Sequence, residues 1–127
     1  MLNIDQMGFA VVVHCAFEDP RVVALVEVDC VFSTNKNTCQ QWRLAPQEDE
    51  EHTLDVVYEK TNTLYQEWWK NEGVLPVFTE QGCRSTSVRD IIKIGDDFWR
   101  VASFGFNKLE GVPDQWHQAR AKINVKD

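Results

Sequence analysis

The sequence of 127 residues contains no run of about 18 apolar residues, the length that a membrane-spanning helix needs. Its first residues also lack the basic segment with which a secretory signal begins. Glycine and proline are few, at 6 and 4 residues, and no stretch rich in them or in serine divides the chain. These absences predict a single globular domain over residues 1–127, located in the cytoplasm and without membrane contact.

Positive charge is also scarce. Thirteen Lys and Arg stand against 20 Asp and Glu, which gives a net charge of −7 at pH 7. Binding to nucleic acid or to an anionic membrane needs a basic surface. The charge balance therefore argues against both of these partners and favours encounters with a basic protein.

Motifs that identify a reaction are absent. The four cysteines and three histidines are scattered, with no Cys-x-x-Cys or His-x-x-x-His pair. There is no glycine-rich phosphate loop and no nucleophile elbow. We therefore expect no metal, no cofactor and no catalytic residue. In a cytoplasmic chain we also expect the four cysteines to be reduced; they are Cys15, Cys30, Cys39 and Cys83.

What the chain does contain is alternation of apolar and polar residues, which is typical of strands. The pattern predicts strands over residues 7–17, 22–33, 38–44, 74–79, 87–94, 98–106 and 117–125. Apolar residues at helical spacing predict one helix of about 24 residues that ends at Gly73. The expected class is α+β: a mainly antiparallel sheet in the order β-β-β-α-β-β-β-β, with one long helix packed on one face. A short helix after Pro113 is the alternative to the last strand.

The register of the first strands follows from their apolar residues. Around a turn at residues 18–21, wholly apolar pairs form on one face when Val13 lies opposite Val26. The third strand then pairs Trp42 with Cys30, so that the first three strands form a meander.

The other face of this meander carries polar residues that could form a site. His14 beside the carboxylate of Glu27 could do acid–base work, because the imidazole pKa lies near neutrality. Arg43 could hold an anionic group of a ligand. The same residues also fit a solvated sheet face with one ion pair between Asp29 and Arg43.

Aromatic residues suggest a second site, between the helix and the sheet, because ligand pockets are often apolar and aromatic. Its expected lining residues are Trp42, Tyr65, Trp69, Trp99 and His117. Aromatic residues at these positions are equally typical of an ordinary core.

The string from Cys83 to Arg89 superficially resembles the loop of cysteine-dependent phosphatases in its cysteine–arginine spacing. Such a loop must open a helix, whose N-terminus lowers the pKa of the thiol. Residues 90–94 instead have the pattern of a strand, and no glycine lies between Cys83 and Arg89. We interpret the string as a polar loop with an uninvolved thiol.

Trp116 begins the polar face of the expected last strand, where a large aromatic side chain needs a cover. A partner subunit could provide that cover, which predicts a homodimer with Trp116 at the interface. The loop at Val112 could also fold back over the ring.

The best hypothesis from these observations is a small acidic, non-enzymatic binding or accessory protein that acts through protein contacts, for example as an inhibitor of a basic partner. The alternative is a small-molecule-binding protein or small enzyme with a pocket between helix and sheet. A filled helix–sheet interface with an apolar patch outside favours the first hypothesis, and a cavity with converging polar groups favours the second.

Overall fold

The computed structural model describes residues 8–28, 30–34, 40–44, 49–62, 67–77 and 82–123. Its elements, in chain order, are β1 (Phe9–His14), β2 (Arg21–Glu27), β3 (Cys30–Thr34), β4 (Gln40–Leu44), α1 (Glu50–Lys60), the short 3₁₀ helix η1 (Trp68–Lys70), β5 (Val74–Pro76), β6 (Ile91–Ile94), β7 (Asp97–Val101), β8 (Phe106–Lys108) and α2 (Asp114–Ile123). The protein is of the α+β class, as predicted.

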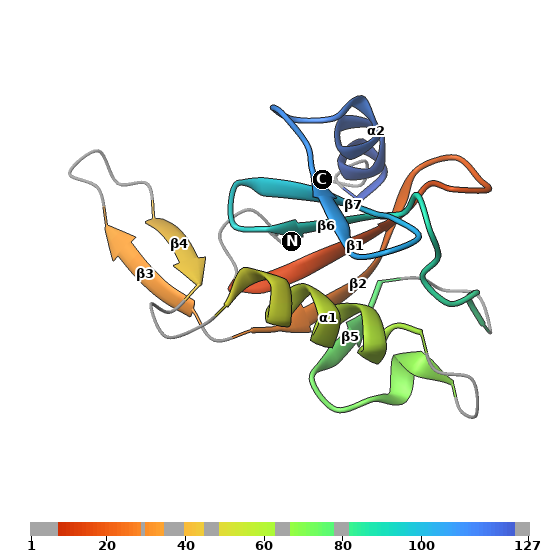
Figure 1. The fold of residues 1–127 in the computed structure, drawn as a ribbon, viewed down its shortest axis with the longest axis horizontal. Coiled ribbons are helices and arrows are strands. Elements are labelled where there is room, and N and C mark those ends of the chain that lie inside the picture. Colours follow the sequence, from red (N-terminus) through yellow and green to blue (C-terminus); the bar gives the residue numbers. More distant parts are fainter. Residues whose placement is uncertain are drawn as a thin grey trace.

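Six strands form one antiparallel sheet in the order β5-β2-β1-β6-β7-β8 (Figure 1). The predicted edge strand with Pro76 is confirmed, because β5 pairs only with β2 in this sheet. The predicted hairpin around Gly95 is confirmed as β6–β7, and Gly95 has the positive φ of 61° that the turn requires. β3 and β4 pair with each other in a separate two-stranded sheet.

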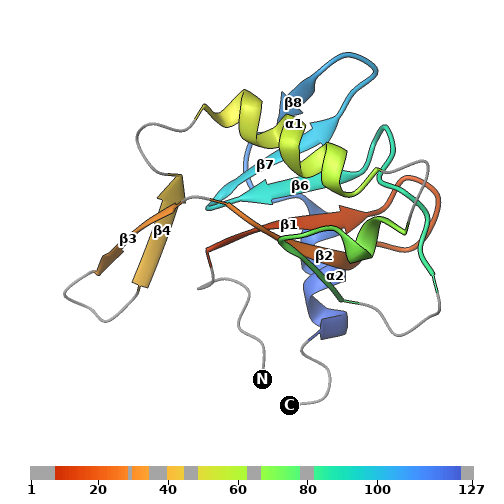
Figure 2. The same cartoon turned by 90° about the horizontal axis from the view of Figure 1, so that it is seen from below.

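The two helices cover opposite faces of the sheet (Figure 2). On the α1 side, Leu54 and Val57 pack in a cluster with Val12. On the α2 side, Trp116 packs in a cluster with Val11. Because successive side chains of a strand point to opposite faces, the unbroken apolar run of β1 serves both clusters.

The single long helix of the sequence analysis is wrong. α1 ends at Lys60, and between it and Gly73 the described residues contain only the separate turn of η1. Beyond Lys60 the chain bonds to another segment: the carbonyl of Thr61 accepts the N–H of Thr86 at 2.9 Å, and the side chain of Asn62 donates to the carbonyl of Thr86 at 2.7 Å. Tertiary hydrogen bonds therefore replace the continuing helix.

The expected last strand is also wrong, and the alternative helix after Pro113 is present as α2. Trp116, Ala119 and Ile123 are spaced by three and four residues, so they share one face of a helix. Trp116 is 5% exposed, and its ring lies 5.8 Å from that of Phe98 between centroids. Burial of this face against the sheet outweighs the alternating pattern.

The predicted register of β1 and β2 is wrong. Val13 pairs with Val22, and Val26 pairs with Ala10, with a bulge between Val12 and Val13. Val13 belongs to the cluster on the α2 side and Val26 to the cluster on the α1 side. The sheet is covered on both faces, so apolar pairing cannot distinguish one register from another.

The three-stranded meander is wrong as well. The second strand ends at Glu27, and within the described ranges the next strand, β3, pairs only with β4. In that hairpin Cys30 lies opposite Leu44, and Trp42 lies opposite Phe32. Arg43 lies opposite Val31. The expected ion pair between Asp29 and Arg43 lies outside the described residues.

Candidate functional site

A buried polar cluster lies at the end of β1, where the turn of residues 15–20 meets the loop of residues 82–90. At its centre is the carboxylate of Asp90, which is fully buried. Five N–H groups donate to it at 2.7–3.0 Å: the backbone N–H groups of Cys15, Ala16 and Ser87, and two from the guanidinium of Arg84. These bonds hold the turn and the loop together, and we call the group the Asp90 cluster.

Arg84 joins two carboxylates in this cluster. Besides Asp90, it donates to Glu18 through Nε at 3.1 Å and through Nη2 at 2.6 Å. Burial alone would raise the pKa of Asp90 and of Glu18, but hydrogen bonds from Arg84 lower both below their ordinary values. The hydrogen bond to Asp90 raises the pKa of Arg84. All three groups are therefore charged at neutral pH.

His14 ends β1 inside the same cluster and is fully buried. Its Nε2 lies 3.1 Å from the hydroxyl oxygen of Thr86, and its Nδ1 lies 3.6 Å from Sγ of Cys83. Its ring centroid lies 6.2 Å from that of Trp68.

Burial lowers the pKa of His14 to about 4. Asp90 and Glu18 oppose this shift, whereas Arg84 and Arg21 add to it. The imidazole is therefore neutral at physiological pH and has one donor and one acceptor nitrogen.

Two cysteines border the cluster on opposite faces of the sheet. Cys15 packs against the cluster of side chains on the α2 side, and its thiol donates to the carbonyl of Arg89 at 3.4 Å. Burial, together with the charge of Asp90, raises the pKa of this thiol to about 11. Cys83 packs on the α1 side, and Nη2 of Arg21 lies 3.5 Å from its sulfur.

An exposed aromatic ring lies directly outside the cluster. Phe17 is 66% exposed, and the guanidinium carbons of Arg84 and Arg89 lie 5.0 and 5.7 Å from its ring centroid. Val88 is a second exposed apolar residue in this region of the chain. We call Phe17, Arg84, Val88 and Arg89 the Phe17 surface.

Arg89 occupies an unfavourable backbone conformation. Its φ is +80°, and among the described residues it is the one residue other than glycine with a positive φ. It lies within a turn closed by a 3.0 Å bond from the N–H of Asp90 to the carbonyl of Ser87. At this place a glycine or asparagine is favoured, because a longer side chain costs roughly 1–2 kcal/mol.

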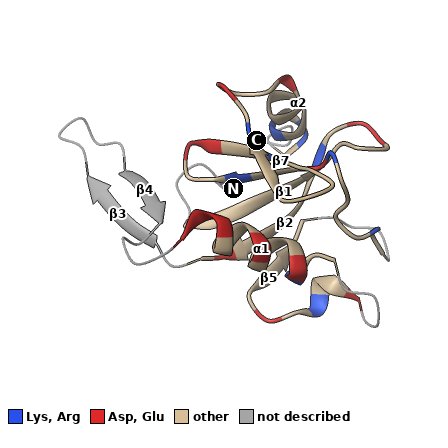
Figure 3. Cartoon of the chain, in the orientation of Figure 1, with Lys and Arg blue, Asp and Glu red and all other residues tan. Residues whose placement is uncertain are grey.

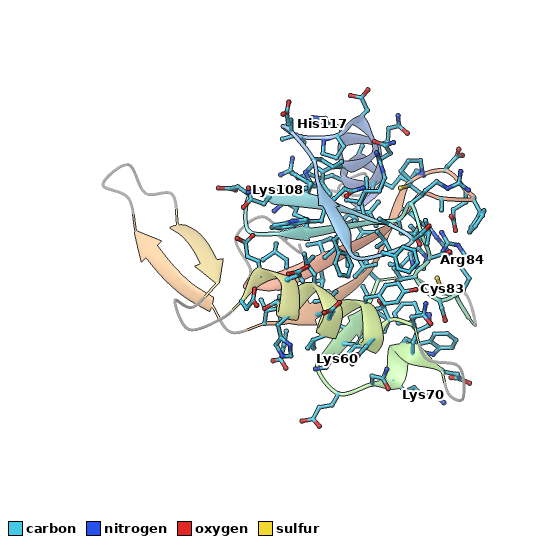
Figure 4. The ribbon with its side chains drawn as sticks, in the orientation of Figure 1. Lys60, Lys70, Cys83, Arg84, Lys108 and His117 are labelled. Atoms are coloured by element: carbon cyan, nitrogen blue, oxygen red, sulfur yellow. The ribbon has the colours of Figure 1, made fainter. Side chains whose placement is uncertain are left out.

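Several of the residues expected from the sequence lie apart from one another within the described part of the chain. Glu27 is exposed at the end of β2, and His117 is exposed on α2, far from Cys83 and Arg84 (Figure 4). Among the described members of the expected set, only His14 belongs to the Asp90 cluster.

Two of the expected aromatic residues belong to the α1 side. Trp69 meets Trp68 edge to face, with 5.5 Å between ring centroids. Trp99 is buried on β7 in the apolar cluster, with Nζ of Lys108 5.6 Å from its ring centroid. The remaining expected lining residues are the side chains of Trp42, Tyr65 and Arg43, which lie outside the described residues.

Trp116 is covered by its own chain rather than by a partner. The observation that motivated a homodimer is therefore gone, although dimer formation itself stays a prediction.

Sequence reasoning missed the roles of Arg84, Thr86 and Asp90. It considered the string from Cys83 to Arg89 only for its cysteine–arginine spacing. A signal was present in the sequence: Asp90 stands immediately before the strand of Ile91–Ile94, whose residues are all buried. A carboxylate at the entrance to such a strand needs donors nearby.

Comparisons with protein-family models, with curated proteins and with solved structures find no match. Within the part of the chain that the structure describes, neither helix has the length and apolar character to cross a bilayer. Among the same residues, no group of three His, Cys, Asp or Glu side chains could hold a metal ion.

Proposed function

We propose that this protein is a small accessory protein that acts through protein contacts, and that the Phe17 surface is its contact region. The observation that carries the proposal is Arg89, an arginine at a turn position that favours glycine, with its guanidinium over an exposed phenylalanine. Unfavourable backbone conformations persist where the side chain serves a purpose. Aromatic and arginine side chains are also the residues that contribute most to binding at protein interfaces.

The Phe17 surface is held in one conformation before any partner binds. Arg84 is fixed by two carboxylates, and the turn that carries Phe17 is fixed by the bonds from Cys15 and Ala16 to Asp90. A surface that is already ordered loses less conformational entropy on binding.

The charge of the chain favours a partner of opposite sign. Acidic residues recur along α1 (Figure 3). Three of them, Glu51, Asp55 and Glu59, are exposed and follow one another at intervals of four residues. Together with the net charge of −7, they would accelerate the encounter with a basic protein, and added salt would slow it.

The test is affinity capture from an extract of the native host with three matched baits. Phe104 supplies the control, because it is 96% exposed on a loop of its own. We expect a protein that wild type and Phe104→Ala both retain and that Phe17→Ala loses. Equal retention by all three baits would show that the Phe17 surface is not the contact region.

A small enzyme or small-molecule-binding protein is the second candidate function. The helix–sheet pocket expected for it is not supported, because Leu54 and Val57 of α1 pack among buried apolar side chains of the sheet. The observation that favours this candidate is the pair of Cys83 and His14, a thiol beside a neutral imidazole.

A further inference from the structure

Three hydroxyl and imidazole groups form a chain of hydrogen bonds that leads from α1 to Cys83. The hydroxyl of Thr61 donates to the carbonyl of Val57 at 2.9 Å. A carbonyl oxygen can only accept, so the proton of the Thr61 hydroxyl is used there. The hydroxyl of Thr86, 2.9 Å away, must then donate to Thr61.

This direction fixes the tautomer of His14. Because the proton of the Thr86 hydroxyl is directed to Thr61, the 3.1 Å contact between Thr86 and Nε2 requires that Nε2 carries the hydrogen. The neutral ring has one N–H group, so Nδ1 has a free lone pair. That lone pair faces Sγ of Cys83 at 3.6 Å.

We propose that Cys83 is a covalent modification site for carbon electrophiles, with Nδ1 of His14 as the acceptor of the thiol proton. The geometry has the three parts that activated nucleophiles need: a nucleophile, a base within reach, and the Thr86 hydroxyl, which orients the base. The guanidinium of Arg21, 3.5 Å from the sulfur, favours the developing thiolate. The site lies on the α1 side and does not depend on the proposed role of the Phe17 surface.

The step balances with a simple alkylating probe. Sγ of Cys83 forms a bond to the methylene carbon of iodoacetamide as the carbon–iodine bond breaks and iodide leaves with the electron pair. The thiol proton moves to Nδ1 of His14. Since the imidazolium of His14 has a pKa of about 4, it then releases this proton to water and the ring returns to neutral.

The experiment uses the folded full-length protein and iodoacetamide, with labelling of each cysteine followed by peptide mass spectrometry. Cys15 is the internal control, because its raised pKa keeps its thiol protonated. We expect Cys83 to react at least about tenfold faster than Cys15, and the two to react alike in denaturant. A native rate for Cys83 equal to or below that of Cys15 overturns the proposal.

Two further measurements separate base catalysis from simple accessibility. His14→Asn keeps a polar group beside the sulfur but removes the base, and it should slow Cys83 severalfold while slow labelling of Cys15 reports that the fold persists. If this variant does not fold, the ¹⁵N chemical shifts of His14 in wild type decide. Protonated Nε2 and unprotonated Nδ1 at pH 7 are expected, and a protonated Nδ1 would refute the assignment.

Discussion

Cys15 and Cys83 border the same buried polar cluster, yet the structure gives their thiols opposite surroundings. Cys15 donates its hydrogen to a backbone carbonyl on the α2 side, and the charge of Asp90 helps to keep it protonated. Cys83 faces a lone pair of His14 and a guanidinium on the α1 side. The difference arises because adjacent residues of a strand point to opposite faces: His14 and Cys15 are neighbours in the chain but serve different sides of the sheet.

The comparison teaches that proximity to a charged cluster does not set the chemistry of a thiol. The nearest partner of the thiol decides its chemistry: beside a carbonyl the thiol is a hydrogen-bond donor, and beside an imidazole lone pair it is a nucleophile.

The largest loss of stability is expected from Asp90→Asn. This substitution removes the negative charge at the centre of the cluster that both cysteines border. It should leave Arg84 with one carboxylate instead of two and turn an amide N–H₂ group toward other donors. Loss of one member of a buried ion pair costs about 3–5 kcal/mol. Urea denaturation should show this loss, and the exposed Asp55→Asn on α1 is the matched control.

Asp90→Asn also tests the difference between the thiols of Cys15 and Cys83. Without the charge of Asp90 the pKa of Cys15 should fall, so its iodoacetamide labelling should rise toward that of Cys83. Unchanged stability, or an unchanged ratio of the two labelling rates, would contradict the central role of Asp90.

A smaller loss of stability is expected when the pH is lowered. The folded-state pKa of His14, about 4, lies below its ordinary value of 6.5, so the unfolded state binds more protons between these two values. The free energy of unfolding should therefore decrease as the pH falls from about 7 to 4, by roughly 3 kcal/mol from this group. Glu18 and Asp90, whose pKa values are lowered, add their own loss as the pH falls below their ordinary values of 4.5 and 3.8.

Urea denaturation at several pH values measures this dependence, and His14→Asn provides the control. The variant should lose the part of the pH dependence between 7 and 4. Equal slopes for wild type and variant would show that His14 is not held neutral. Labelling of Cys83 should likewise show no inflection near pH 6.5, because its base stays unprotonated there.

The smallest change in stability is expected from Arg89→Asn, at the residue whose carbonyl accepts the hydrogen bond of Cys15. Asparagine tolerates a positive φ better than arginine, so the variant should be more stable by roughly 0.5 kcal/mol. Val88→Asn, at the neighbouring turn position whose φ is not positive, should show no such gain. If Arg89→Asn is less stable than wild type, the contact of Arg89 with Phe17 is worth more than the backbone strain.

The local elements of this protein were predictable where one pattern dominated. The β6–β7 hairpin follows from two apolar runs around Gly95. α1, which is the first half of the expected helix, follows from helical spacing after an acidic start. The end of α1 was not predictable, because hydrogen bonds to Thr86, 25 residues farther along the chain, terminate the helix at Thr61. α2 was predicted as a strand because the sequence shows the alternation of its residues. The sequence does not show the sheet face against which Trp116 packs.

The candidate site shows the same division. The sequence by itself determined an acidic α+β chain with a strongly apolar first pair of strands, because composition and periodicity are local properties. Only the tertiary structure decided that both faces of the sheet are covered, which is why apolar pairing could not select the register. It also decided that His14, Cys83 and Asp90, which are up to 76 residues apart in the sequence, meet at one end of the sheet. Hydrogen bonds across such separations depend on how strands pair and loops cross, and no local pattern encodes them.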